Sequence, residues 1–296
     1  MAVPRGLLML CLLAISYDIC QGFEQVCHQC DCFVSEGYKE RGVRNIKPPC
    51  NEGSIRWRNP NGGLRVQLQS GYTSNFRACF AVEATNIAVK ISQEFVIASG
   101  KQISGQRSSY LHAVAITANR TKEICIPSSS SYPSVLLYLE TERLPHQSGV
   151  QKVTFHYVIE AIRSNTLLFN PMEEECRPCD RRELVQAYCA SDFVVTGKMT
   201  SVTHLDDIER SKMDVEVSRV IRQKGQLFTY FRDDQSLRGS LVAPRHCGIQ
   251  YGKGDFLFTG HLRLGHLTIS CSPYLSEWKE VLMAALADGT MECEVD

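Results

Sequence analysis

Fourteen cysteines constrain what this 296-residue chain can fold into more than any other feature of its sequence. So many are unusual in a cytosolic protein, where thiols stay reduced, and are typical of chains exported to an oxidising compartment. Residues 1–22 support export, because Arg5 precedes an apolar run, Gly6–Ile15, that is too short to span a bilayer and typical of a signal peptide. Cleavage after Gly22 leaves twelve cysteines, the even number that a complete disulfide framework requires; a retained N-terminal anchor is the alternative.

Other features also predict a secreted, extracellular glycoprotein. No later segment approaches the roughly 18 consecutive apolar residues of a membrane-spanning helix, so we expect no membrane insertion once the signal is removed. Asn119-Arg120-Thr121 is an N-glycosylation sequon, which predicts a glycan on Asn119. Lys and Arg total 32, as do Asp and Glu, and this neutral balance gives no reason to expect binding to nucleic acid.

The cysteines fall into two groups, at 27–125 and 176–293, separated by fifty residues without any cysteine. An Asn-Pro turn and three glutamates at 170–175 predict an acidic linker between them. Residues 23–168 carry 16 basic and 11 acidic side chains, whereas residues 173–296 carry 15 and 20. The opposite net charges could orient the two halves or bias the choice of partner. The alternative is that the two halves have independently solvated surfaces.

The first half is predicted to be a β-sandwich. Ile55 and Trp57 alternate with polar residues, and a turn at 59–63 joins their strand to another at 64–68. Apolar residues at 153–159 repeat the period of two. Short alternating strands separated by Gly and Ser breaks are typical of a sandwich, with Trp57 on its buried side.

The second half is predicted to be a small β-barrel with flanking helices, closed by disulfides. A short helix is expected at 181–188, with strands at 193–199, 213–217, 256–258 and 267–269. A last helix has one apolar stripe, in which Trp278 is the largest residue and an expected core anchor; the stripe consists of Leu275, Trp278, Val281, Leu282 and Ala285.

Several longer motifs resemble known extracellular modules. The start and end of the second half are similar to a netrin-like module in Cys176-Arg177-Pro178-Cys179, Cys189–Val195, Asp255–Gly260 and Gly265–Cys271. Closer matches indicate the meteorin family, namely Cys176–Gly197, Val217–Lys224, Asp255–Leu262, Glu292–Val295 and, in the first half, Cys50-x-Glu52-Gly53-x-Ile55-x-Trp57. The resemblance covers nearly the whole mature chain in order. It implies a mainly β protein with a CUB-like β-sandwich at 23–163, a linker at 164–175 and a netrin-like, OB-type β-barrel with flanking helices at 176–296.

The resemblance also implies a disulfide connectivity that spacing alone cannot supply. Netrin-like modules pair their first three cysteines with their last three in the same order. The implied bridges are Cys176–Cys247, Cys179–Cys271 and Cys189–Cys293, with Cys79–Cys125 in the sandwich.

Three cysteines precede Cys50, where the family usually has one. We take Cys32 as the family cysteine and expect the bridge Cys32–Cys50. Cys27 and Cys30 then pair with each other or link two chains. A zinc site that includes His28 is the less favoured alternative in an exported chain with an even cysteine count.

We expect no catalytic activity, no metal and no cofactor. The chain lacks the common zinc-protease, serine-hydrolase and phosphate-loop motifs, and its eight histidines are scattered. Cys176-x-x-Cys179 has the spacing of a thiol oxidoreductase, but no βαβ pattern surrounds it. The first half has no aspartate after Asp31, so the acidic ligands of calcium-binding CUB modules are missing.

The resemblance implies a secreted signalling factor that acts through a cell-surface receptor, with a neurotrophic, cytokine-like or hormone-like role in glial and neuronal differentiation. Basic residues at 41–47 and 219–224 make heparan sulfate a second candidate partner. The alternative function is an extracellular-matrix modulator, either a metalloproteinase inhibitor or an adaptor similar to procollagen-proteinase enhancers. Inhibitory netrin-like modules bind the enzyme's zinc through a free N-terminal cysteine, whereas Glu175 precedes Cys176 and makes its nitrogen an amide.

Overall fold

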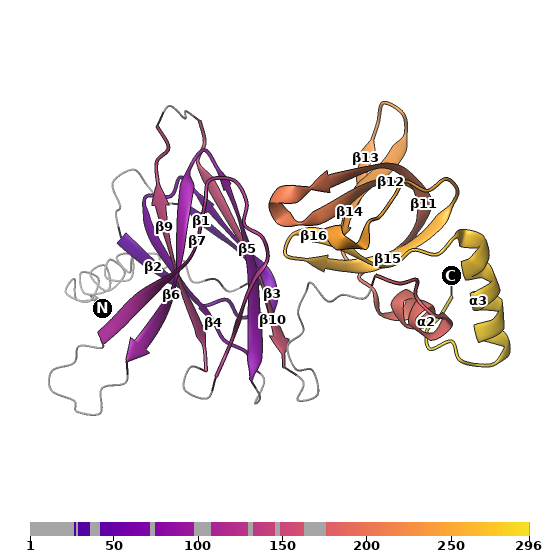
Figure 1. The fold of residues 1–296 in the computed structure, drawn as a ribbon, viewed down its shortest axis with the longest axis horizontal. Coiled ribbons are helices and arrows are strands. Elements are labelled where there is room, and N and C mark those ends of the chain that lie inside the picture. The colour runs from indigo at the N-terminus through magenta and orange to yellow at the C-terminus, as the bar shows by residue number, and fades with distance from the viewer. Residues whose placement is uncertain are drawn as a thin grey trace, which may run out of the picture.

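The fold was described from a computed structural model (Figure 1), which covers residues 27, 29–35, 42–71, 75–97, 108–129, 133–145, 149–162 and 176–295. The expected signal peptide with cleavage after Gly22, His28 and the linker at 164–175 lie outside the described residues. Strands dominate the described residues, which confirms the predicted mainly β class. No helix in these ranges combines the length and the apolar character needed to cross a bilayer.

The first half forms two five-stranded sheets that face each other. Sheet I has the order β1 (Asp31–Ser35), β3 (Glu52–Arg58), β10 (Lys152–Ala161), β5 (Phe76–Thr85) and β8 (Ile124–Pro127). Sheet II has the order β2 (Gly42–Ile46), β4 (Gly62–Leu68), β9 (Val135–Glu142), β6 (Ala88–Ile97) and β7 (Ser108–Thr117). The first strand of each sheet pairs in parallel with its neighbour, and the other pairs are antiparallel.

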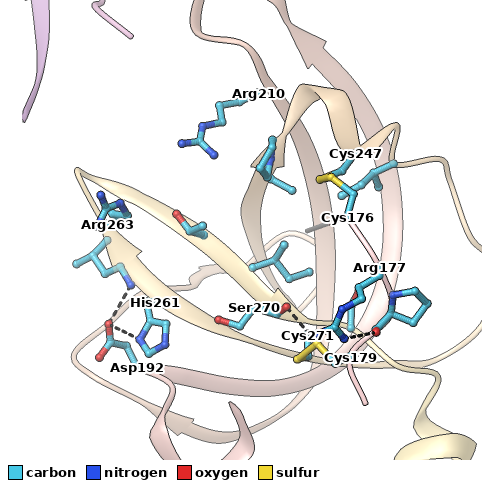
Figure 2. Close-up of a pocket in the computed structure, with 18 of the residues that line it drawn as sticks. Cys176, Arg177, Cys179, Asp192, Arg210, Cys247, His261, Arg263, Ser270 and Cys271 are labelled. Atoms are coloured by element: carbon cyan, nitrogen blue, oxygen red, sulfur yellow. Dashed lines mark hydrogen bonds and ion pairs between the residues drawn. A yellow bond between two sulfur atoms is a disulfide. The ribbon is translucent and has the colours of Figure 1, made fainter. Parts of the chain in front are cut away.

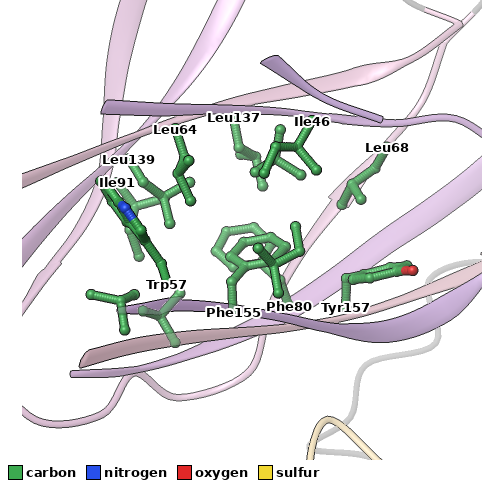
Figure 3. Packing of buried hydrophobic residues seen from close by; sticks show 14 of the residues in the cluster. Ile46, Trp57, Leu64, Leu68, Phe80, Ile91, Leu137, Leu139, Phe155 and Tyr157 are labelled. Atoms are coloured by element: carbon green, nitrogen blue, oxygen red, sulfur yellow. The ribbon is translucent and has the colours of Figure 1, made fainter. Parts of the chain in front are cut away.

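Aromatic side chains from sheet I pack against aliphatic side chains from sheet II in the space between the two sheets (Figure 3). Alternation along β10 turns Val153, Phe155 and Tyr157 inward, as the sequence pattern predicts. The rings of Phe155 and Phe80 stack with their centres 5.4 Å apart. Trp57 is fully buried, and its indole Nε1 has no hydrogen-bond partner among the described residues.

The second half forms a closed five-stranded barrel. Its strands are β11 (Phe193–Leu205), β12 (Arg210–Gln223), β14 (Ser236–Pro244), β15 (Phe256–Arg263) and β16 (His266–Cys271). They pair in the order β12-β11-β15-β16-β14, and pairing of β14 with β12 closes the ring. Short strand β13 (Thr229–Phe231) pairs antiparallel with the first residues of β14. This is the OB-type barrel that the resemblance implies.

Gly197 allows β11 to bend around the barrel. A Cβ at this position would lie 2.3 Å from the carbonyl oxygen of Glu216 on β12. The register between the two strands also shifts beside Gly197. A residue without a side chain at this point therefore lets the strands approach closely where the sheet curves.

Two helices cover one end of the barrel, α2 (Arg181–Ala190) and α3 (Leu275–Ala287). Asp180 and Glu183 form a capping box at the start of α2, in which each side chain accepts a hydrogen bond from the other's backbone N–H. Tyr188 of α2 stacks on Trp278 of α3 with ring centres 4.7 Å apart. Trp278 is thus buried between the helices, on the predicted apolar stripe. Two 3₁₀ turns, Asp206–Ile208 and Arg245–Cys247, complete the regular structure.

Six disulfides link the twelve cysteines of the described residues. The three barrel bridges are Cys176–Cys247, Cys179–Cys271 and Cys189–Cys293, in the order that the resemblance implies. Cys79 and Cys125, which are directly opposite each other on β5 and β8, form the implied sandwich bridge.

The N-terminal cysteines pair differently from the expectation. Cys30 bonds to Cys50 and Cys32 bonds to Cys27, so the expected bridges Cys32–Cys50 and Cys27–Cys30 are not formed. The direction of the side chains on β1 explains this. Cys32 points into the sandwich and is 7% exposed, whereas the carbonyl of Cys30 lies against Gly53, where a Cβ would be 2.0 Å away. The backbone of Cys30 is therefore beside the start of β3, with its Cα 5.2 Å from that of Cys50.

Candidate functional site

The sandwich and the barrel meet where one tight turn of the barrel contacts the outer face of sheet I, a contact that we call the joint (Figure 1). Leu264 and Gly265 connect β15 to β16 with φ angles of 48° and 80°, the left-handed pair typical of a type I′ turn. Leu264 is 8% exposed and packs with Cys79 and Ala81 of β5. A Cβ on residue 265 would lie 2.6 Å from Cε1 of His156, so glycine lets the turn reach the sheet.

Arg263 connects two carboxylates of the sandwich at the joint. Its guanidinium donates hydrogen bonds to Glu123, at 2.5 Å, and to Glu160. Glu160 also accepts a hydrogen bond from Arg77 at 2.5 Å, and Glu123 accepts one from Arg210 of the barrel at 3.2 Å. The side chains of Arg263 and Glu123 are only 23% and 11% exposed. Loss of Arg263 or of Glu123 would therefore leave largely buried charges with one ion pair fewer.

Within this cluster, neighbouring opposite charges favour the charged forms of Glu160 and Arg263. Burial alone would raise the pKa of Glu160, but hydrogen bonds and positive charge from Arg77 and Arg263 hold that pKa below its usual value. Burial alone would lower the pKa of Arg263, yet Glu123 and Glu160 raise it above its usual value. Glu160 and Arg263 therefore both keep their charges near neutrality.

Exposed ion pairs surround this cluster. Lys122 of the sandwich pairs with Glu209 of the barrel, and Lys224 of the barrel lies 3.0 Å from Glu52 of the sandwich. All four side chains are about half exposed or more, so each pair contributes little, on the order of 0–1 kcal/mol. Apart from Lys122–Glu209, the ion pairs across the joint described here join barrel cations to sandwich carboxylates. This direction is opposite to that of the net charges of the two halves, so net charge does not explain the contact.

A cleft of about 1100 Å³ lies beside the joint, between the sandwich and the barrel (Figure 2). Glu160 is on its sandwich wall, and Arg263, Asp192 and His261 are on its barrel wall. The carboxylate of Asp192 accepts a hydrogen bond from the backbone N–H of Leu262 at 3.0 Å and lies 3.5 Å from Nδ1 of His261. Charged groups in the cleft thus pair with one another.

Cysteines near the cleft are oxidised. Cys176 and Cys179, which have the spacing of a redox motif, bond to Cys247 and Cys271. Cys176 and Cys247 also lie close to His246, and Cys79 and Cys125 lie close to Glu123, at distances that suit a shared metal ion. Thiolates are the metal ligands and nucleophiles of cysteine chemistry, and a disulfide provides none. Both clusters are therefore structural bridges in this state of the chain.

Several residues of the basic segments named as heparan sulfate candidates have partners within the chain. Arg222 donates hydrogen bonds to the backbone carbonyls of Tyr188 and Ser191, and Lys224 pairs with Glu52. In the segment at 41–47, Arg41 lies outside the described residues, and Arg44 is engaged in a non-covalent interaction.

The sequon is presented at the surface of the sandwich. Asn119 is exposed in the turn that follows β7. Thr121 is buried, and its Oγ1 accepts a hydrogen bond from the backbone N–H of Val82 at 2.9 Å. The expected site of glycan attachment is therefore accessible, while the threonine of the sequon also supports β5.

Comparison with known proteins finds similarity to meteorin and meteorin-like proteins. A family model described as "Meteorin, C-terminal domain" matches residues 178–285. The chain is similar to the meteorin-like protein of Xenopus laevis, with 29% identity over 86% of this chain and 85% of the relative. It is also similar to the meteorin-like protein of Homo sapiens, with 28% identity over 86% of this chain and 78% of the relative. Meteorin of Mus musculus has 28% identity over 86% and 85% of the two chains.

Proposed function

Because the chain belongs to the meteorin family, we propose that it is a secreted signalling factor of the meteorin type that acts through a cell-surface receptor and has no catalytic activity. Its role would be neurotrophic, cytokine-like or hormone-like, in glial and neuronal differentiation. Secretion is supported by the six disulfides, which require an oxidising compartment to form and persist.

The observation that carries the proposal is the joint. Leu264 and Arg263 attach the barrel to the sandwich through buried contacts. Residues of these two bodies, the sandwich and the barrel, therefore keep fixed positions relative to one another. A receptor can then contact both at once without ordering them on binding, and such preorganisation favours affinity. The cysteine clusters that could suggest chemistry are disulfides, which supports a binding role over catalysis.

We take Tyr230 and Phe231 of β13 as the first receptor contacts to test. Their side chains are 54% and 44% exposed, and the guanidinium of Arg238 lies 5.3 Å from the centre of the Phe231 ring. Exposed tyrosine and arginine are enriched among the few residues that dominate binding energy at protein interfaces. Tyr251 is also 54% exposed on the barrel and provides a matched control.

The test is binding of labelled full-length protein to intact glial and neuronal cells. We expect saturable binding at nanomolar concentrations that persists after heparinase treatment. Y230A/F231A should weaken binding at least tenfold, and Y251A should not. Loss of binding after heparinase would instead identify heparan sulfate as the partner and contradict the receptor proposal.

The matrix-modulator alternative is less well supported. The backbone nitrogen of Cys176 is an amide, its sulfur is bonded to Cys247, and the residue lines the cleft between barrel and sandwich. An enzyme's zinc would need a free amine at this position. Inhibition of a metalloproteinase by the intact full-length protein would nevertheless overturn the signalling proposal.

A further inference from the structure

The joint contains one histidine from each body. His156 lies on β10 of the sandwich, and His266 lies at the start of β16 in the barrel. The ring of His156 is against the turn at Gly265, and His266 lines the small cavity beneath the same turn. Both residues are half-buried, and both lie where the sandwich and the barrel are in contact.

Positive groups face this pair from both bodies. Arg120, after β7, acts on both histidines, Arg56 of β3 acts on His156, and Arg210 of β12 acts on His266. Arg263 and Glu123 line the same small cavity as His266.

Two nearby carboxylates oppose these charges but are already engaged. Glu83 of β5 accepts a hydrogen bond from Arg120 at 2.5 Å. Asp31 of β1, which acts on His156, accepts two hydrogen bonds from Ser54, at 2.9 and 2.8 Å. The surroundings of the histidine pair are therefore unfavourable to added positive charge.

We propose that the joint is an acid-sensitive latch, closed while His156 and His266 are neutral and opened when they take up protons. Opening separates the turn at Leu264 from sheet I and exposes both imidazoles to water, and it requires no unfolding of either body. This property belongs to the joint itself and holds whichever receptor the protein binds.

The direction of the effect follows from the two pKa values. Burial, followed by the charge of Arg120, lowers the pKa of His266 to about 4 in the closed state. Burial, together with Arg120 and Arg56, also lowers the pKa of His156, and Glu83 opposes the shift at both sites. The open state binds protons near the ordinary histidine pKa of about 6.5. The closed state is therefore most stable above that pH, and its stability relative to the open state decreases as the pH falls below it.

The size of the effect can be stated for His266 alone. With pKa values of about 4 closed and about 6.5 open, the open-to-closed ratio rises about 30-fold between pH 7.5 and pH 5. His156 adds to this in the same direction. Glu160 keeps its charge over this range because its pKa is lowered, so the histidines titrate before this partner of Arg263.

Small-angle X-ray scattering of the purified full-length protein tests the latch, with the radius of gyration measured from pH 7.5 to pH 4.5. We expect the wild-type radius to rise below pH 6.5 while near-ultraviolet circular dichroism shows that both bodies remain folded. H156Q/H266Q should stay compact over the same range. H112Q, which changes an exposed histidine on β7, should behave as the wild type.

A second variant keeps the test decisive if the double variant does not fold. R120Q retains both histidines and removes the cation that faces them, so its opening should shift to lower pH. The proposal is overturned if the wild type remains compact down to pH 4.5, if H156Q/H266Q expands in the same range as the wild type, or if R120Q does not move the transition.

Discussion

Arg263 of the barrel and Glu160 of the sandwich are 103 residues apart in sequence and form an ion pair across the joint. The pair is reinforced by Glu123 and Arg77, so four charged side chains from four separate parts of the chain hold one contact. The relation between the two bodies therefore depends on a few enclosed charges and on Leu264, and it can be altered without touching either core.

Replacing Arg263 should loosen the joint without unfolding the bodies. R263A removes hydrogen bonds to two poorly exposed carboxylates, and we expect it to weaken the joint by about 2 kcal/mol. The measurement is the radius of gyration at neutral pH, which should rise. R245A, which removes an exposed pair with Asp206, is the control and should change nothing. An R263A protein as compact as the wild type would show that the ion pair is dispensable.

Removing the longest disulfide loop should destabilise the barrel. Cys189 and Cys293 are separated by 104 residues, and loss of their bridge in C189S/C293S should cost about 4 kcal/mol or less in the free energy of unfolding. C27S/C32S opens a separation of only five residues and should cost about half as much. Urea denaturation of both variants without reductant provides the comparison, and equal losses would argue against a role for loop length.

Trp278 should be the main anchor of the two helices. W278A removes a ring that stacks on Tyr188 inside the helix interface and should cost about 3–5 kcal/mol. M283A on the same helix removes a side chain that is 68% exposed and should change stability by less than about 0.5 kcal/mol. Thermal unfolding of the two variants measures the difference. Similar melting temperatures would mean that α3 contributes little to the barrel.

Asn119 should carry a glycan when the protein is expressed in animal cells. Peptide N-glycosidase should lower the mass of the wild type, and N119Q should lack this shift, whereas T121S keeps the sequon and should retain it. T121A should lose the glycan and also about 1–3 kcal/mol of stability, because the N–H of Val82 would be left without its partner. A wild-type mass that the enzyme does not change would exclude occupancy.

Local patterns could be predicted from the sequence because they depend on near neighbours. Alternation placed Ile55, Trp57 and the apolar residues of β10 on the buried face, and the spacing of residues along α3 placed Trp278 inside. The barrel disulfides came from the family resemblance, since spacing does not determine pairing.

The N-terminal bridges could not be predicted in the same way. Cys27, Cys30 and Cys32 lie within six residues of one another, and their partners depend on the parallel register between β1 and β3, which pairs Cys32 with Ile55. A long-range register of this kind leaves no local signal in the sequence.

The joint was missed for a related reason. Arg263 and Leu264 follow a strand that the sequence predicted, but nothing near them indicates a partner on another body. The opposite net charges of the two halves suggested an electrostatic contact, yet the observed pairs mostly run in the other direction. Summed charge is thus a poor guide to the few enclosed residues that make a contact.

Chemical crosslinking of the purified protein to the surface of responsive glial cells tests the central claim most directly. We predict one membrane protein that is crosslinked at nanomolar concentrations, lost in the presence of excess unlabelled protein and retained after heparinase treatment. Crosslinked products that unlabelled protein does not displace, or that disappear with heparan sulfate, would contradict a receptor-binding signalling factor.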